Sequence, residues 1–345
     1  MNFKRLDHFL SSFSQDVGID LGTANTPIKI RGHSAIISEP SYVTLDNNRL
    51  RVVAVGHESK MMEGKTPPNL SVVRPVRDGV IAEFDIASEL MKYLMRRVNT
   101  QGVLRPRVIV GVPSETTEVE RRAVAEATRM AGARVVYLID QPVAAAIGAD
   151  LEVLKPQGNL VLDIGGGTSE LAMISLGGVV ICECLKIAGD KMDEAIVNYV
   201  RQKYDLIIGE RSAEEIKIQI GTVIPNGEIE LSTVKGRDMK TGLPRRVELS
   251  SHEIAEALAP IIAKLLDMIK RAMENIPPEL VSDIFLQGIV LTGGGALLRG
   301  LDQLLTRALG VKCYQAEQPL LSVVMGQEKI FQNRDLMRKI PLERF

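Results

Sequence analysis

The stretch LVLDIGGGTSELAMISL, residues 160–176, places three glycines and a threonine between two apolar runs. Glycine allows positive φ angles and lets the backbone approach a ligand without a Cβ in between, so this turn offers several N–H groups and one hydroxyl. Phosphate oxygens accept hydrogen bonds from such donors. A dinucleotide-binding fold would place a helix after the glycines, whereas here a second apolar run follows. The stretch therefore predicts a β-hairpin whose turn binds phosphate.

A similar pattern occurs near the start of the chain, where DVGIDLGTANTPIKIRG (16–32) also reads as a strand, a turn and a second strand. The segment GIDLGT, residues 18–23, places Asp20 in an apolar strand before a glycine and a threonine, as LDIGGGT places Asp163. Two copies of one motif, each beginning one half of a 345-residue chain, predict two related α/β halves that face each other across a cleft. Such turns can hold a nucleotide's phosphates from opposite sides, with Asp20 and Asp163 holding a hydrated Mg²⁺.

Helix and strand signals alternate between the two motifs. RVIVGVP (107–113) and RVVYLID (134–140) read as buried strands, and TEVERRAVAEATRMAG (117–132) reads as the helix between them. A strand, a crossover helix and a second strand form a β-α-β unit. The first half therefore contains parallel strands.

Three further signals lie in the second half. Ser212 and Glu215 have the spacing of a capping box and predict the start of a helix. Pro260 lies inside a long helical pattern and is expected to kink or divide that helix. The glycines at 293–295 lead into a helix and are expected to pass under a nucleoside rather than its phosphates.

The amino-acid composition indicates which kinds of partner and which compartment are expected. Lys and Arg number 42 against 43 Asp and Glu, a net charge of −1, and basic residues form no long block, so nucleic acid is not an expected partner. Cys182, Cys184 and Cys313 are interpreted as buried thiols in a reducing compartment, and we expect a cytoplasmic protein.

The N-terminal residues 1–14, MNFKRLDHFLSSFS, have an amphipathic pattern. Apolar side chains recur at helical spacing; they are Phe3, Leu6, Phe9, Leu10 and Phe13. The pattern predicts a helix that lies in a membrane interface, with packing on the protein itself as the alternative. Val103 and Leu104 are an apolar pair in NTQGVLRP (99–106), which is expected to be a loop. Such a pair is unremarkable by itself, and only the family resemblance given below implies a second membrane contact there.

Longer motifs resemble the MreB/Mbl family of bacterial actins, within the superfamily of actin, heat-shock chaperone and sugar kinase ATPases. The motifs are DLGTANT (20–26), RPVRDGVIAEF (74–84), DIGGGTSELAMISL (163–176), AGDKMDEAIVNYVRQKY (188–204) and TGGGALLRGL (292–301). The resemblance extends from about residue 16 to about residue 325.

The resemblance implies an actin-like (ribonuclease H-like) duplicated α/β fold, in which two domains surround a nucleotide cleft and each has a larger and a smaller subdomain. The implied segments are 1–15 for membrane binding; 16–42, 76–155 and 325–345 for subdomain IA; 43–75 for IB; 156–191 and 256–324 for IIA; and 192–255 for IIB.

The resemblance also implies ATP or ADP with Mg²⁺ as cofactors, and filaments that organise cell-wall synthesis and rod shape on the inner face of the cell membrane. The implied partners are further copies of the chain, the lipid surface, and membrane-bound elongation proteins such as RodZ and MreC.

The implied nucleotide contacts fall on the matching motifs. They are Asp20, Gly22, Thr23, Ala24, Asn25, Gly165, Gly166, Gly167, Thr168, Gly189, Glu214, Glu215, Ile216, Lys217, Gly293, Gly294, Gly295 and Ala296. The residue types alone support the glycines, whereas Glu214 and Lys217 by themselves indicate only a solvated helix face.

Gln141 departs from the family pattern. In the family, the residue before the proline of EEPxAAAIG is a glutamate that helps to hold the attacking water, but this chain reads IDQPVAAAIGAD at 139–150. A glutamine can orient water but cannot take up its proton. Gln141, Thr168 and Asp163 are the catalytic candidates for a weak ATPase. The alternatives are a scaffolding filament with little hydrolysis and a small-molecule (sugar-type) kinase on the same fold.

Overall fold

The computed structural model describes residues 14–49, 51–98, 104–225 and 229–345. A six-stranded sheet organises the first half, in the order β19-β10-β9-β1-β2-β3. Its strands are β1 (Ser14–Asp20), β2 (Asn25–Ile30), β3 (Ile36–Pro40), β9 (Leu104–Val112), β10 (Val135–Asp140) and β19 (Glu343–Arg344). Strands β1, β9 and β10 run parallel, and β1 and β2 form an antiparallel hairpin. The predicted parallel strands and first hairpin are therefore confirmed.

A five-stranded sheet organises the second half, in the order β13-β12-β11-β17-β18. Its strands are β11 (Asn159–Ile164), β12 (Ser169–Ser175), β13 (Gly178–Leu185), β17 (Ile289–Thr292) and β18 (Cys313–Gln315). Strands β11 and β12 pair in register from Asn159↔Ile174 to Ile164↔Ser169, so residues 165–168 form a tight turn. The hairpin predicted from residues 160–176 is confirmed.

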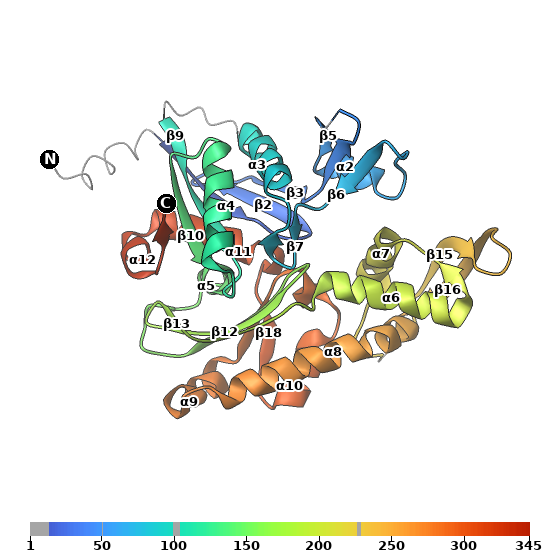
Figure 1. The fold of residues 1–345 in the computed structure, drawn as a ribbon. Helices are drawn as coiled ribbons and strands as arrows, with labels where there is room; N and C mark the ends of the chain where they lie inside the picture. The colour runs from blue at the N-terminus through green and yellow to red at the C-terminus, as the bar shows by residue number, and fades with distance from the viewer. Residues whose placement is uncertain (1–13, 50, 99–103, 226–228) are drawn as a thin grey trace.

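Two small three-stranded sheets extend from the same side of the molecule (Figure 1). The first contains β4 (Val43–Asp46), β5 (Arg51–Val55) and β6 (Leu70–Val73), with helix α2 (His57–Met62) beside it. The second contains β14 (Leu206–Ile207), β15 (Leu231–Asp238) and β16 (Pro244–Ser250). A separate short hairpin pairs β7 (Val76–Arg77) with β8 (Val80–Ile81).

Helices cover the faces of the two large sheets and line the gap between them (Figure 1). They are α3 (Phe84–Arg97), α4 (Glu118–Met130), α5 (Gln141–Gly148), α6 (Gly189–Tyr204), α7 (Glu210–Ile220), α8 (Ser251–Glu274), α9 (Pro278–Gln287), α10 (Leu301–Leu309), α11 (Ser322–Gln332) and α12 (Arg334–Lys339), with 3₁₀ turns η1 (Gly294–Leu297) and η2 (Pro319–Leu321).

One buried core joins the halves. It combines Ile139 of the first large sheet and Val161 of the second with the apolar side chains of α5 and α11. The two helices pack backbone to backbone: a Cβ on Gly148 would lie 1.8 Å from the carbonyl oxygen of Ser322, and a Cβ on Gly326 would lie 1.8 Å from that of Ala144. Larger side chains have no room at either position, so glycine sets the helix separation.

Two predictions about helices are wrong. Helix α7 begins at Glu210 with Gly209 as its N-cap, so Ser212 lies inside the helix and does not cap it. Helix α8 is one helix from Ser251 to Glu274 with Pro260 inside it, so the predicted division at Pro260 is wrong, whereas the kink stays a prediction. Because Glu256 and Pro260 are both exposed, the carbonyl group that loses its partner at the proline faces water, and the helix need not end.

The predicted membrane contacts are mostly outside the described residues; these are Phe3, Leu6, Phe9, Leu10, Phe13 and Val103. Placing Leu104 in a loop was wrong, because Leu104 is the first residue of β9 and its backbone pairs with Ser14 of β1. Among the described helices, none is long and apolar enough to cross a membrane.

We expect Gly326→Ala to lower the free energy of unfolding by about 2 to 3 kcal/mol, because the added methyl group must push α11 away from α5. Urea denaturation without nucleotide measures the change. Gly178→Ala is the matched control, because its Cβ would have its nearest neighbour 3.9 Å away. Equal midpoints for the two variants would contradict the close helix contact.

Candidate functional site

The candidate site lies at the carboxyl ends of the parallel strands. Asp20 ends β1, Asp140 ends β10, and Asp163 lies one residue before the end of β11. Parallel strands bring their carboxyl ends to one edge of a sheet, and ligands of open α/β sheets bind at this edge. The two large sheets therefore present their carboxyl edges, with these aspartates, to the same region.

The two glycine-threonine turns are in contact. A Cβ on Gly166 would lie 2.9 Å from the Cβ of Ala24, and a Cβ on Gly167 would lie 2.7 Å from Oγ1 of Thr23. These distances are too short for any side chain larger than hydrogen. The sequence predicted that the turns would lie on opposite sides of a cleft, and the structure brings them together with only glycine between them.

The first turn is closed by its own backbone. The N–H of Gly22 donates to the carbonyl oxygen of Asp20 at 2.9 Å, and a Cβ on Gly22 would lie 2.4 Å from the carbonyl oxygen of Asn25. Thr23 is buried, Ala24 is half-buried and Asn25 is exposed. The side chain of Asn25 and the backbone of the turn are thus accessible to a ligand.

A third turn, which the sequence analysis missed, packs against the other two. Asp78 and Gly79 connect β7 to β8 with φ angles of 49° and 77°, and the N–H of Gly79 donates to Oγ1 of Thr23 at 3.1 Å. A Cβ on Gly167 would lie 2.9 Å from the Cα of Asp78. The Asp-Gly pair is a strong sequence signal for a hairpin turn and could have revealed this element.

Two acidic side chains lie behind the turns. Burial raises the pKa of Asp20 to about 7, with a further increase from the negative charge of Asp163 and a decrease from the hydrogen bond with Gln141. Burial likewise raises the pKa of Asp163, although Oγ1 of Thr292 donates to its carboxylate at 2.7 Å. The two carboxylates repel each other, so a cation between or near them would lower the energy of the ionised pair.

Oxygen donors of this kind suit Mg²⁺, which binds proteins through one or two carboxylates, waters and phosphates. Among the described residues, no group of three or more His, Cys, Asp or Glu side chains could enclose a metal ion. The arrangement therefore fits a hydrated ion that is shared with a phosphate ligand, with Asp20 and Asp163 as the protein's contribution.

Gln141 is held by one of these carboxylates. Its Nε2 donates to Oδ1 of Asp20 at 2.8 Å, and its side chain is 7 % exposed at the start of α5. The amide oxygen of Gln141 therefore has a defined orientation beside the turns. Thr168, at the end of the second turn, is also buried, and its backbone closes the turn by accepting from the N–H of Gly165 at 2.8 Å.

The start of α6 connects the second turn to α7. The N–H groups of Gly189 and Asp190 donate to the carbonyl oxygens of Gly165 and Gly166, at 3.2 and 2.8 Å. Nζ of Lys217 donates to the carbonyl oxygen of Gly189 at 2.9 Å and pairs with Asp193 at 2.8 Å. Gly189 and Lys217 thus lie beside the phosphate-turn candidates.

The other predicted residues of α7 differ in exposure. Glu214 is half-buried and pairs with Lys60 of α2 at 2.7 Å, whereas Glu215 is exposed and pairs with Arg211 one turn earlier. Ile216 belongs to the apolar core of the second half at 4 % exposure. Its side chain is therefore not available to a ligand.

The third glycine run also lies near the acidic pair. Gly293 has a φ of 79°, and a Cβ there would lie 2.9 Å from Oδ1 of Asp163. Gly294 and Gly295 begin the 3₁₀ turn η1, and Gly294 is exposed. Ala296 is buried, and its carbonyl oxygen accepts from Nε2 of Gln315 at 2.7 Å.

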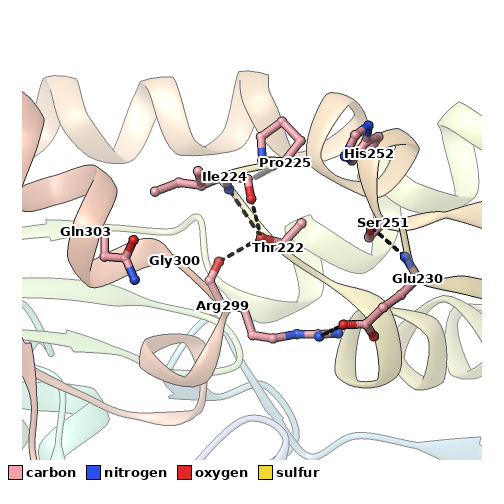
Figure 2. Close-up of a pocket in the computed structure, with 9 residues that line it drawn as sticks. All are labelled: Thr222, Ile224, Pro225, Glu230, Ser251, His252, Arg299, Gly300 and Gln303. Carbon is pink, nitrogen blue, oxygen red and sulfur yellow. Dashed lines mark hydrogen bonds and ion pairs between the residues drawn. The ribbon is translucent and has the colours of Figure 1, made fainter. Parts of the chain in front are cut away.

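A separate pocket of about 210 Å³ lies in the second half (Figure 2). It is lined by Thr222, Ile224, Pro225, Glu230, Ser251, His252, Arg299, Gly300 and Gln303. Arg299 is already paired with Glu230 and also donates to the carbonyl oxygens of Gln219 and Gly221. The lining contains no aspartate and none of the turn residues, so this pocket does not support the kinase alternative.

Comparison with known proteins decides the family. The family model described as MreB/Mbl protein matches residues 14–339. The chain belongs to the MreB/Mbl family. The cell shape-determining protein MreB of Escherichia coli (strain K12) is 46 % identical over 337 residues, which cover 96 % of this chain and 97 % of that protein. The cell shape-determining protein Mbl of Bacillus subtilis (strain 168) is 44 % identical over 328 residues, 95 % of this chain and 98 % of that protein.

Solved structures agree with this MreB/Mbl assignment. MreB5 of Spiroplasma citri bound to ADP is 33 % identical with a TM-score of 0.88, covering 92 % of this chain and 96 % of that one. The same protein bound to AMPPNP superposes with a TM-score of 0.89 over 94 % and 97 % of the two chains. A MamK double helical filament, 20 % identical with a TM-score of 0.79, shares the fold. The predicted actin-like α/β fold is confirmed.

The raised pKa of Asp20 gives a prediction for pH dependence. A carboxyl whose pKa rises from 3.8 to about 7 on folding stabilises the folded protein at low pH, and this contribution is lost as pH rises through about 7. Without nucleotide or Mg²⁺, Asp20→Asn should therefore gain stability relative to wild type between pH 5 and pH 7 and then level off. Thermal melting across this range measures the difference in stability between the variant and wild type. A difference that is the same at every pH would contradict the raised pKa of Asp20.

Proposed function

We propose that this protein binds ATP with Mg²⁺, hydrolyses it slowly and assembles into filaments that organise cell-wall synthesis at the membrane. The observation that carries the proposal is the contact between the two glycine-threonine turns, with Asp20 and Asp163 behind them. Relatives at 44 to 46 % identity are cell shape-determining proteins, and a relative at 33 % identity binds ADP and AMPPNP.

The turns supply the groups that phosphates require. The N–H groups of Gly22 and Gly165 close the turns themselves, so those of residues 23–25 and 166–168 would donate to phosphate oxygens, because glycine leaves the backbone uncovered. Asp20 and Asp163 would hold Mg²⁺ through water, and the ion would neutralise the phosphate charge. Gly189, Glu214 and Lys217 would contact the ribose and base from the α6 and α7 side, with Gly293–Gly295 beneath the nucleoside.

Hydrolysis requires a water molecule in line with the terminal phosphorus. Positioning supplies most of the rate in phosphoryl transfer, and Gln141 is already oriented by its hydrogen bond to Asp20. The amide oxygen of Gln141 would accept a hydrogen bond from the attacking water, with the Thr168 hydroxyl as a second contact. Because an amide cannot take up the water's proton, that proton must pass to a phosphate oxygen or to solvent, and we propose that turnover is slow.

Gln141→Ala should lower the rate of phosphate release from ATP by about 100-fold, because the attacking water loses its orientation. Nucleotide affinity should change little, since the turns are intact. Phosphate release and equilibrium binding of ATP are measured on the same preparation. Gln202→Ala, an exposed glutamine on α6, is the matched control. Turnover equal to wild type in Gln141→Ala would remove this residue from the mechanism.

Membrane attachment is proposed from the amphipathic residues 1–14. A helix with three phenylalanines on one face and Lys4 and Arg5 beside it suits an anionic lipid surface. One such helix binds weakly and reversibly, so many copies in a polymer would provide stable attachment by avidity. Membrane-bound elongation proteins of the RodZ and MreC kind are the proposed protein partners, and the four-subdomain division remains part of the same proposal.

Sedimentation of the full chain with anionic liposomes tests filament assembly and lipid binding together. We expect pelleting in ATP, and we expect Phe9→Ser with Leu10→Ser to abolish the liposome-dependent part because the apolar face is lost. Pelleting of polymer without liposomes should persist in this variant. Phe9→Leu is the conservative control. A chain that stays in the supernatant with ATP and liposomes would contradict the filament proposal.

A further inference from the structure

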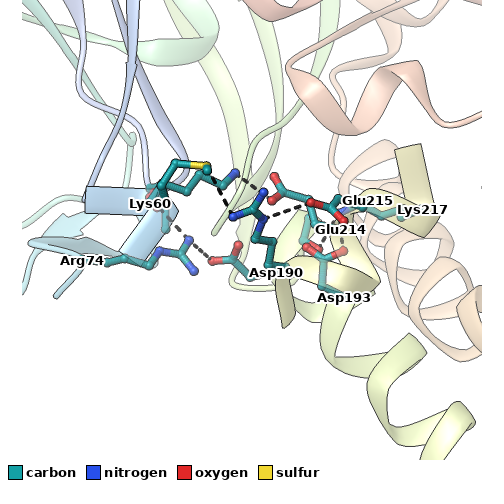
Figure 3. Close-up of polar contacts among 11 residues, drawn as sticks. Lys60, Arg74, Asp190, Asp193, Glu214, Glu215 and Lys217 are labelled. Carbon is teal, nitrogen blue, oxygen red and sulfur yellow. Dashed lines mark hydrogen bonds and ion pairs between the residues drawn. The ribbon is translucent and has the colours of Figure 1, made fainter. Parts of the chain in front are cut away.

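Two ion pairs connect the small sheet of the first half to helices of the second half (Figure 3). Nζ of Lys60, in α2, lies 2.7 Å from Oε2 of Glu214 in α7. A guanidinium nitrogen of Arg74, just after β6, lies 2.6 Å from Oδ2 of Asp190 in the first turn of α6. The two halves are therefore joined on this side by charged groups, whereas the α5–α11 core joins them through apolar packing.

The inner pair also contacts both phosphate turns. The same nitrogen of Arg74 that pairs with Asp190 lies 3.4 Å from the carbonyl oxygen of Thr23 in the first turn. The backbone N–H of Asp190 donates to the carbonyl oxygen of Gly166 in the second turn at 2.8 Å. Arg74 therefore links the two turns through one side chain, and separating the halves must break this link.

Tyr42 holds both cations in place. Its ring centroid lies 5.8 Å from Nζ of Lys60 and 5.5 Å from the guanidinium carbon of Arg74, within the range of cation–π attraction. The tyrosine is 6 % exposed, so its ring position is set by packing. Lys60 and Arg74 thus both lie against the ring of one buried tyrosine of the first half.

The side chains of the two pairs are partly shielded from water. Lys60 and Glu214 are 21 % and 26 % exposed, and Arg74 and Asp190 are 17 % and 35 % exposed. Shielded pairs with good geometry are stronger than fully exposed pairs, and ionic strength weakens them in proportion to their exposure. Both pairs must break before the small sheet can move away from α6 and α7.

We propose that Lys60 and Arg74 form an ionic latch between the two halves, beside the phosphate turns, which sets the rate at which bound nucleotide leaves. The inference rests on the proposed nucleotide binding and adds a role that the turns do not have: the turns hold the phosphates, and the latch keeps the halves closed over them. Arg74 acts as a positioning residue because it contacts the first turn directly and the second turn through Asp190. Glu214 serves twice, as the latch partner of Lys60 and as a proposed nucleotide contact.

Nucleotide release tests the latch. ATP that carries a fluorescent N-methylanthraniloyl group is bound to the full chain with Mg²⁺ and then chased with unlabelled ATP in a stopped-flow instrument. Lys60→Met and Arg74→Met should each release the probe about tenfold faster than wild type, since each loses one charge-assisted bond across the cleft. Arg74→Lys keeps the charge without the planar fork, should give an intermediate rate, and serves if Arg74→Met does not fold.

Lys92→Met is the matched control. Lys92 pairs with Glu89 at 2.7 Å, the same distance as in the Lys60 pair, but both residues lie on α3 and the pair does not cross the cleft. Its release rate should equal that of wild type. Raising KCl from about 50 to about 500 mM should accelerate release from wild type more than from the Lys60→Met/Arg74→Met double variant, which has no latch left to screen.

The outcomes separate the latch from the proposed function. Faster release in both variants, with a normal control and the reduced salt effect, supports the latch. Tight binding of the probe with release rates equal to wild type overturns the latch and leaves nucleotide binding intact. A wild-type chain that does not bind the probe overturns the proposed nucleotide function, and the latch with it.

Discussion

The repulsion between the half-buried carboxylate of Asp20 and the buried carboxylate of Asp163 is the constraint around which the candidate site is organised. Asp20 and Asp163 end or nearly end the first strands of their sheets, and the parallel strands bring both to the same region. Burial and mutual charge raise the pKa of Asp20, so the ionised pair is costly without a cation. A site built in this way favours a cation that arrives with an anionic partner. A magnesium-nucleotide complex has this chemistry.

The rest of the fold maintains this geometry from two sides. Glycines at 148 and 326 let α5 and α11 approach until their backbones touch, which fixes the distance between the large sheets. Gln141 is the first residue of α5, so the packing that joins the halves also orients the side chain beside Asp20. On the other side of the cleft the contacts are ionic. Apolar packing resists opening at all ionic strengths, whereas ion pairs between partly exposed groups weaken as ionic strength rises.

Sequence patterns predicted correctly those elements whose formation depends mainly on residues that are neighbours in the sequence. The hairpin at 160–176, its counterpart at 16–32 and the parallel strands of the first half follow from apolar periodicity and glycine placement. The prediction for Ser212 was wrong because α7 begins at Glu210, with Gly209 as its N-cap. The predicted division of α8 at Pro260 was wrong because that side of the helix faces water. In both cases a short sequence pattern predicted where a helix starts or ends. The structure has a different start or end, and its energy depends on which residues and how much water surround the helix.

The sequence by itself determined the two turns, the aspartates beside them and the family to which the chain belongs, because those features are encoded in contiguous residues with strict backbone requirements. Only the tertiary structure decided that the turns touch, that Asp78–Gly79 packs against them, and that Ile216 is buried in the core rather than free to meet a ligand. The pairing of Arg74 with Asp190 spans 116 residues and that of Lys60 with Glu214 spans 154. The sequence of an amphipathic helix does not show which residue a charged side chain on it will pair with. These pairs form only when the two halves pack together and bring the residues within reach.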